Sequence, residues 1–158
     1  MLNHQEFLFS DLIANRNQEK DLLREKNIAC HIEVVCTDEV GSNRRVDILA
    51  HDPRSKSTYI IDPTILFESN EDVGRMVQAE KEAIYTGCSD DIKKSFPQYP
   101  IENIEIYGLW FGARGTISPQ IISFFNRFGL DESHLVGMAE SVVIDSIKMI
   151  HHHIYASN

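Results

Sequence analysis

Basic residues are scarce in this chain. Its 158 residues include 15 Lys and Arg against 24 Asp and Glu, so the formal net charge at pH 7 is −9. Surfaces that bind nucleic acid on their own are usually basic. The charge therefore argues against a large autonomous nucleic-acid surface. It remains compatible with an acidic nuclease whose site is neutralised by metal ions and whose DNA affinity comes from another domain.

Cysteines and long apolar runs are also few. The three cysteines, Cys30, Cys36 and Cys88, are odd in number and form no Cys-x-x-Cys pair. We expect reduced, partly buried thiols in an intracellular protein. No apolar run approaches the roughly 20 residues that span a bilayer. Residues 1–6 lack the basic end and apolar core of a signal peptide, so no membrane partner is expected.

The remaining composition is that of a folded domain. Hydrophobic residues make up 42% of the chain, which is a globular value, and the length predicts a single domain over residues 1–158. Hydrophobic periodicity and turn residues predict an order of elements along the chain. The predicted elements are a helix over about 4–26, strands over 28–36, 44–50 and 58–65, a helix over 70–86, a short turn over 90–95, a strand over 101–111, and two helices between about 118 and 156.

This order predicts an α/β fold with a mixed central sheet flanked by helices. The core covers about residues 4–111, and the C-terminal helices form an extension over about 118–156. Ser69 is the predicted N-cap of the 70–86 helix, and Gly87 is predicted to end it. Ser118 and Pro119 open the next helix and Gly129 closes it. Asp131 opens the last helix, whose predicted apolar face carries Leu135, Ala139, Val142, Val143, Ile147 and Ile150.

Alternation predicts which side chains of the 28–36 strand share a face. In a regular strand, residues two apart point the same way. His31 and Glu33 are therefore predicted on one face. The opposite, apolar face is predicted to carry Ile28, Cys30, Ile32, Val34 and Cys36.

Two acids occupy the hairpin formed by the second and third strands. Asp47 interrupts one apolar strand and Asp62 interrupts the next, and a polar turn over residues 51–57 joins the two strands. A hairpin centred on that turn places Asp47 opposite Asp62, about 5 Å apart. Two carboxylates at that spacing repel unless a cation lies between them. Mg²⁺ or Mn²⁺ is the natural candidate, because Mg²⁺ prefers one or two carboxylates with waters and a phosphate.

An alternative explanation for the two acids is structural, since Asp often ends a strand at the surface near a turn. Two observations favour a site. Each acid lies within an apolar strand instead of flanking it, and Arg44 and Arg45 stand just before the first. Glu33, on the preceding strand, is a further candidate metal ligand at the same end of the sheet.

A lysine would complete a phosphodiesterase site, because hydrolysis needs an activated water and a stabilised pentavalent phosphate. The position two after Asp62 is Thr64, so the candidate is Lys81 in the following helix. Gln78, Lys81 and Tyr85 share one face of that helix. From spacing alone, a solvated lysine between two glutamates is the stronger interpretation of Lys81.

The acids and the lysine together resemble a known family. That family is the restriction-like endonuclease domain of early-branching, site-specific non-LTR retrotransposons, within the PD-(D/E)xK superfamily. The resemblance covers roughly residues 4–128, and segment 108–117 is similar to segments that follow this domain in reverse-transcriptase polyproteins. The matching order is Arg45-x-Asp47, then Asp62-x-Thr64, then Lys81-x-x-x-Tyr85.

The resemblance implies a restriction-endonuclease-like core and a metal-dependent DNA endonuclease that nicks target DNA to prime reverse transcription. Asp47 matches the family's first metal-binding aspartate and Asp62 its second acid. Lys81 matches a lysine that has moved to the helix, and Tyr85 the aromatic residue that follows it. The implied partners are DNA and an attached reverse-transcriptase domain. The implied location is nuclear if the chain derives from a eukaryotic element.

Three further residues are assigned to the positioning of DNA. Arg45 and Gln78 join Tyr85 in this role, and Arg114, in a glycine-flanked loop, is a candidate for contacting a phosphate. An ordinary surface arginine is the alternative for Arg114. Val46 stands where the family usually has proline, and no zinc-ligand spacing is present. These departures, with the charge of −9, support a second hypothesis of a catalytically inactive module that only binds nucleic acid or protein.

Overall fold

A computed structural model of the chain describes residues 18, 20–67 and 72–155, and its elements follow the predicted order. A helical segment at residues 20–25 comes first, and residues 4–17 of the helix predicted over about 4–26 lie outside the described residues. The elements after it are β1 (Ala29–Thr37), β2 (Asn43–Asp52), β3 (Ser57–Leu66), α2 (Val73–Tyr85), the 3-10 turn η1 (Thr86–Cys88), α3 (Ser89–Ser95), β4 (Asn103–Gly112), α4 (Pro119–Phe128) and α5 (Ser133–Tyr155).

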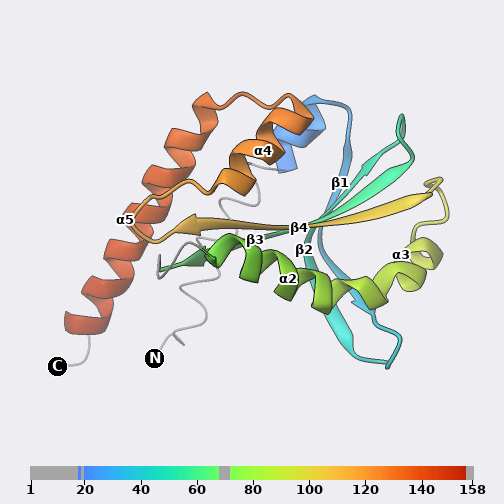
Figure 1. The fold of residues 1–158 in the computed structure, drawn as a ribbon, viewed down its shortest axis with the longest axis horizontal. Coiled ribbons are helices and arrows are strands. Elements are labelled where there is room, and N and C mark those ends of the chain that lie inside the picture. The colour runs from blue at the N-terminus through green and yellow to red at the C-terminus, as the bar shows by residue number, and fades with distance from the viewer. Residues whose placement is uncertain (1–17, 19, 68–71, 156–158) are drawn as a thin grey trace.

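The four strands form one mixed sheet in the order β1-β2-β3-β4. β1, β2 and β3 are antiparallel neighbours, whereas β4 returns through α2 and α3 to pair parallel to β3. Figure 1 shows α2 and α3 along one side of this sheet and α4 and α5 on the other. The predicted α/β class, with a mixed sheet between helices and extra C-terminal helices, is confirmed.

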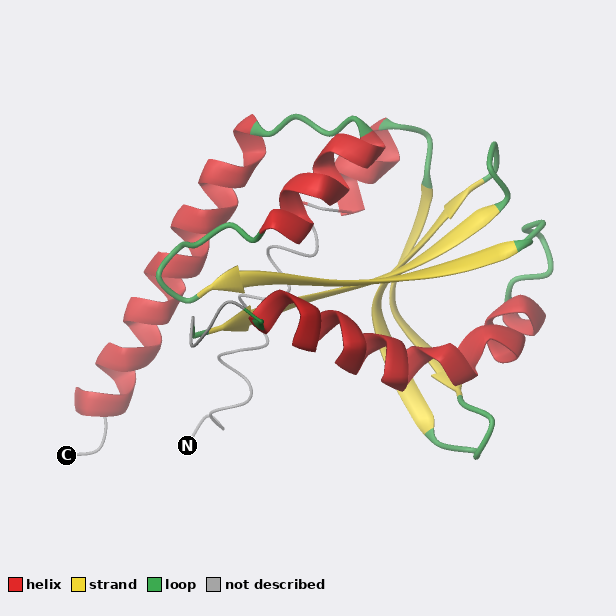
Figure 2. Cartoon of the chain, in the orientation of Figure 1, coloured by secondary structure: helices red, strands yellow, loops and turns green. Residues whose placement is uncertain are grey.

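Each face of the sheet has its own apolar cluster. The cluster under α4, α5 and residues 20–25 includes Ile48, Ile61 and Phe111. The cluster on the α2 and α3 side includes Leu49, Ile60 and Tyr85. Neighbouring residues of β2 and β3 thus enter opposite cores, as expected for strands covered on both faces. The helices on the two sides of the sheet are also seen in Figure 2.

Local capping signals are correct for α4 and wrong for α2. Ser118 accepts a hydrogen bond from the Ile121 amide, and Gly129 closes α4 with a φ of 59°. In contrast, α2 begins at Val73 with Asp72 at its N-cap, and the predicted cap Ser69 lies outside the described residues. The predicted end of the helix near Thr86 is correct, since α2 ends at Tyr85 with Thr86 as its C-cap. Gly87 itself lies inside η1, which leads directly into α3.

Glu33 overturns the predicted faces of β1. Its φ is 55°, a left-handed value that breaks the alternation of side chains. Before it, Cys30 packs in the α4 and α5 cluster. After it, Cys36 packs in the α2 cluster. Ile32, directly before Glu33, is 43% exposed instead of lying on a buried face. A single strand therefore supplies both cores.

The last helix is apolar over more of its surface than the fold covers. Leu135, Met138 and Val142 are buried against the sheet, but Ile147 is 60% exposed and Ile150 is 50% exposed. The predicted apolar face is thus only partly the packed face. In the described part of the chain, no helix combines the length and apolar character needed to cross a membrane.

Candidate functional site

Three acidic residues lie in one row across three neighbouring strands. The β2–β3 ladder runs from Asp52↔Ser57 to Ile48↔Ile61, and one step further places Asp47 opposite Asp62. The β1–β2 ladder pairs the residues on either side of Glu33 with those on either side of Asp47. The predicted hairpin register is therefore the observed one.

The row falls where the regular pairing of the sheet is interrupted. The β2–β3 ladder ends just before Asp47 and Asp62, although both strands continue beyond that point. The left-handed Glu33 interrupts the β1–β2 ladder at the same level. Strands that stop pairing leave room between them for side chains.

Asp62 is the centre of the site. It is 6% exposed and accepts from three side chains. Lys81 Nζ lies 3.2 Å from Asp62 Oδ1, and Tyr85 donates its hydroxyl to Oδ2 at 2.7 Å. Thr64 donates weakly to Oδ1 at 3.5 Å. A buried carboxylate requires such partners, because an uncompensated buried charge is costly.

Lys81 reaches Asp62 from α2 across the surface of the sheet. Its side chain is only 13% exposed, so it is not the solvated lysine that spacing alone favours. Glu80 Oε1 lies 3.9 Å from the same ammonium, at the limit of an ion pair. Lys81 thus contacts Asp62 from the helix, whereas Thr64 occupies the strand position two residues after Asp62.

Tyr85 is a buried partner of the carboxylate. Its ring is 4% exposed, and its hydroxyl also lies 2.8 Å from the Arg45 carbonyl oxygen. Burial and the charge of Asp62, followed by that of Asp47, raise the pKa of Tyr85 well above its usual range. The phenol therefore remains a neutral donor, and Asp47 lies close enough to influence it.

Glu33 and Arg45 form an ion pair next to the row of acids. Arg45 Nη2 lies 2.6 Å from Glu33 Oε1, with the two side chains 47% and 36% exposed. Arg45 is thus paired with one of the three acids of the row, in a contact that is partly exposed to solvent. A role for Arg45 in positioning DNA and a role for Glu33 as a metal ligand both stay predictions.

The donor set suits a hard divalent cation. Asp47 and Asp62 offer oxygen ligands, and a carboxylate accepts about four hydrogen bonds or metal contacts in all, so Asp62 keeps capacity beyond its three donors. Mg²⁺ commonly uses one or two carboxylates and takes its other ligands from water and phosphate. Among the described residues, no group of three or more His, Cys, Asp or Glu side chains is arranged to hold a metal.

The other two predicted DNA-positioning residues have partners other than the carboxylates of Asp47 and Asp62. Gln78 hydrogen-bonds to the backbone of β4 at Ile106 and Gly108. Arg114 is exposed in the loop after β4, where it lines a hollow with Ala139 and Val143 of α5. The hollow lies on the α5 side of the sheet, whereas Asp62 and Lys81 meet on the α2 side.

Gly108 is a site residue that sequence reasoning missed. It pairs with Asp62 in the parallel β3–β4 ladder, and α2 packs directly on it. A Cβ at this position would lie 3.0 Å from Lys81 Cγ and 3.0 Å from the Val77 carbonyl oxygen. The signal in the sequence is a glycine inside an otherwise bulky strand, which indicates a close approach of backbone.

Comparisons with known proteins identify no family. No family model matches the chain, and no curated protein matches it. A solved structure with a similar course is that of AF1548, a protein of unknown function. It has 13% sequence identity and a TM-score of 0.41, and the match covers 89% of this chain and 98% of that chain. A likeness at this level bears on neither activity nor substrate.

Proposed function

We propose that this protein is a metal-dependent DNA endonuclease that nicks target DNA, as for target-primed reverse transcription. The observation that carries the proposal is the buried contact between Lys81 and Asp62 at 3.2 Å. Asp47 and Asp62 each come one residue after the last β2–β3 pair, Ile48↔Ile61, so a continuation of that register would place them opposite each other. Two acids and a lysine converge from two strands and a helix, although they are far apart in sequence. The resemblance to the restriction-like endonuclease domain of non-LTR retrotransposons rests on the same residues.

Each of these side chains has a role that its surroundings support. Asp47 and Asp62 would hold Mg²⁺ or Mn²⁺. The bound metal supplies a more acidic water and a Lewis acid at a phosphate oxygen. Lys81 brings a compact positive charge to the pentavalent phosphate. Tyr85 fixes the orientation of the Asp62 carboxylate through its 2.7 Å hydrogen bond.

The reaction is hydrolysis of one phosphodiester bond. The oxygen of water bonds to phosphorus, the bond from phosphorus to the 3′ oxygen breaks, and the leaving oxygen gains a proton. The products are a 5′ phosphate and a 3′ hydroxyl. A free 3′ hydroxyl is what a polymerase extends, which fits a nicking enzyme that provides a primer end.

Conversion of supercoiled plasmid to open circles tests the proposal. The parent protein should nick with Mg²⁺ or Mn²⁺, and a chelator should stop it. Asp62→Asn and Asp47→Ala should abolish nicking, and Asp47→Ala should fold as well as the parent because it relieves repulsion between opposed acids. Asp90→Asn, an exposed acid at the start of α3, is the matched control. Nicking by Asp62→Asn at the parent rate would show the assignment to be wrong.

The competing function is a catalytically inactive module that binds nucleic acid or protein. The net charge of −9 and the neutralisation of Arg45 by Glu33 favour it. Binding of DNA by both the parent and Asp62→Asn, with no nicking by either under any divalent metal, would establish this alternative.

A further inference from the structure

The carboxamide of Gln78 makes two hydrogen bonds to the backbone of β4. Its Nε2 donates to the Ile106 carbonyl at 2.7 Å, and its Oε1 accepts from the Gly108 amide at 2.8 Å. Among the strands of the described residues, β4 stands at an edge of the sheet and has β3 as its neighbour. Gln78 therefore satisfies backbone groups that face away from the sheet.

These two backbone groups are the pair that another strand would use. The carbonyl of Ile106 and the amide of Gly108 flank Tyr107, and one residue of a parallel neighbour would bond to both. The primary amide of Gln78 takes the place of that residue's peptide group. Because it engages a donor and an acceptor together, it fixes α2 on β4 in both position and rotation.

Gly108 fixes the same contact from the side of the strand. The absence of a Cβ lets α2 approach until Lys81 Cγ and the Val77 carbonyl oxygen would each lie 3.0 Å from one. Lys81 follows Gln78 by three residues, about 4.5 Å along the helix axis. Any sliding or rotation of α2 on β4 is therefore passed on to the Lys81 ammonium.

We infer that Gln78 and Gly108 are positioning residues, which act through α2 to hold Lys81 against Asp62, and that Gln78 does not contact DNA. The ion pair between Lys81 and Asp62 depends on the position of α2, because its distance is 3.2 Å and both side chains are largely buried. The catalytic consequence of this inference rests on the proposed function. The positioning itself does not, so the two can be tested separately.

A double-mutant cycle in unfolding measures the contact without any activity. Lys81→Met, Asp62→Asn and the double variant give the coupling between the two side chains, expected at about fivefold or more in the unfolding constant. Gln78→Met keeps the length and helix propensity of the side chain but loses both hydrogen bonds. In that background the coupling should fall below about twofold. Gln78→Glu keeps only the oxygen that accepts from the Gly108 amide. In that background the coupling between Lys81 and Asp62 should lie between the value in the parent and the value in Gln78→Met.

The matched control removes the third partner of Gln78. Gln78 Nε2 also lies 2.8 Å from Glu82 Oε1 in an exposed contact, so Glu82→Ala should leave the coupling at the parent value. Gly108→Ala should lower the coupling, because the added Cβ on β4 pushes α2 away from the strand. Unchanged coupling in Gln78→Met, or no coupling in the parent, would overturn the inference.

Kinetics on DNA distinguish positioning from contact with the substrate. Gln78→Met should lower kcat about tenfold with KM unchanged, since binding is intact and the transition state alone loses its charge. A raised KM with unchanged kcat would instead place Gln78 on the DNA and refute the inference. If the parent protein nicks no DNA while the coupling falls as expected, the proposed function fails and the positioning role stands.

Discussion

The Tyr85 hydroxyl lies 2.7 Å from Oδ2 of Asp62, the oxygen of that carboxylate that Lys81 does not contact. Tyr85 and Lys81 are one turn apart on α2, so a single helical face supplies donors to both oxygens. A phenol has one proton for its two acceptors, Asp62 and the Arg45 carbonyl, and the charged acceptor is favoured. The orientation of the carboxylate is thereby set before any ligand binds.

Tyr85→Phe tests the stabilising part of this arrangement. Hydrogen bonds to charged groups contribute about 2 kcal/mol, and the removal leaves a buried carboxylate oxygen with one donor fewer. The free energy of unfolding in urea should fall by about that amount. Tyr155→Phe, at a residue that is 64% exposed, should change it by less than about 0.5 kcal/mol. Equal effects of the two variants would contradict the role of the Tyr85 hydroxyl.

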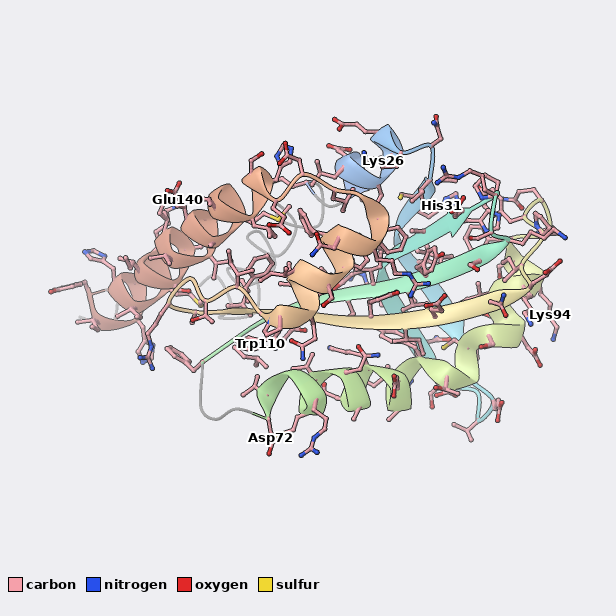
Figure 3. The ribbon with its side chains drawn as sticks, turned by 45° about the horizontal axis from the view of Figure 1, so that its top comes forward. Lys26, His31, Asp72, Lys94, Trp110 and Glu140 are labelled. Atoms are coloured by element: carbon pink, nitrogen blue, oxygen red, sulfur yellow. The ribbon has the colours of Figure 1, made fainter. Side chains whose placement is uncertain are left out.

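Lys81→Ala tests the catalytic part. Nicking should slow by about a hundredfold or more, the usual effect of removing one positioned electrostatic group, while DNA affinity changes little. Lys81→Arg should restore little activity, because a guanidinium differs in shape from a compact ammonium. The control is Lys94→Ala, at an exposed lysine of α3 that is labelled in Figure 3. Folding of each variant is checked by circular dichroism before the rates are compared.

The buried cysteines predict how stability depends on alkaline pH. Burial raises the pKa of Cys30 to about 11 and, with Cys88 beside it, the pKa of Cys36 to about 12. Above pH 9 the unfolded chain loses these thiol protons while the folded chain keeps them. The contribution of these thiols to the free energy of unfolding should therefore be constant below pH 8 and fall between pH 9 and 11, by up to about 1.4 kcal/mol per pH unit for each thiol.

Cys30→Ala should make that alkaline decline shallower, because one of the titrating groups is removed. The same burial predicts that the thiols of Cys30, Cys36 and Cys88, all free and buried, react slowly with a disulfide reagent at pH 8 until the protein is unfolded. Rapid labelling of the folded protein would contradict the burial of the thiols.

The left-handed backbone at position 33 should make glycine more stabilising there than alanine, although the position lies inside a strand. A left-handed backbone costs an ordinary residue about 1–2 kcal/mol, whereas glycine adopts it freely. Glu33→Gly and Glu33→Ala both lose the ion pair with Arg45, so their difference reports the backbone alone. The glycine variant should be the more stable by about 1 kcal/mol in urea unfolding. At the regular position Val35 the same pair of substitutions should favour alanine.

Local signals predicted much of the fold. Alternating apolar residues on both sides of a polar turn predicted the β2–β3 register correctly. The opposition of Asp47 and Asp62 follows from a continuation of that register by one residue and stays a prediction. Helical spacing predicted that Lys81 and Tyr85 share a face. The caps Ser118 and Gly129 were correct because their chemistry acts within a few residues. Each of these features depends on neighbours in the sequence.

The features that the sequence left undetermined depend on distant contacts. Nothing about a glutamate indicates a left-handed conformation, so the reversal of faces at Glu33 was missed. The close packing of α2 on Gly108 requires two elements that are far apart in the chain. In α5, one apolar helix face meets the sheet only along part of its length, so Ile147 and Ile150 could not be separated from Val142 by spacing.

The left-handed Glu33 also affects how this protein behaves in a crowded solution. β1 forms one border of the sheet, and Ile32 and Val35 on either side of Glu33 are 43% and 62% exposed. A regular, apolar border strand is a template onto which another chain can add. The bend at Glu33 and the charges of Glu33 and Arg45 interrupt that template in the middle. Straightening it, as Glu33→Val would favour, should promote aggregation into intermolecular sheet even where the folded monomer stays stable.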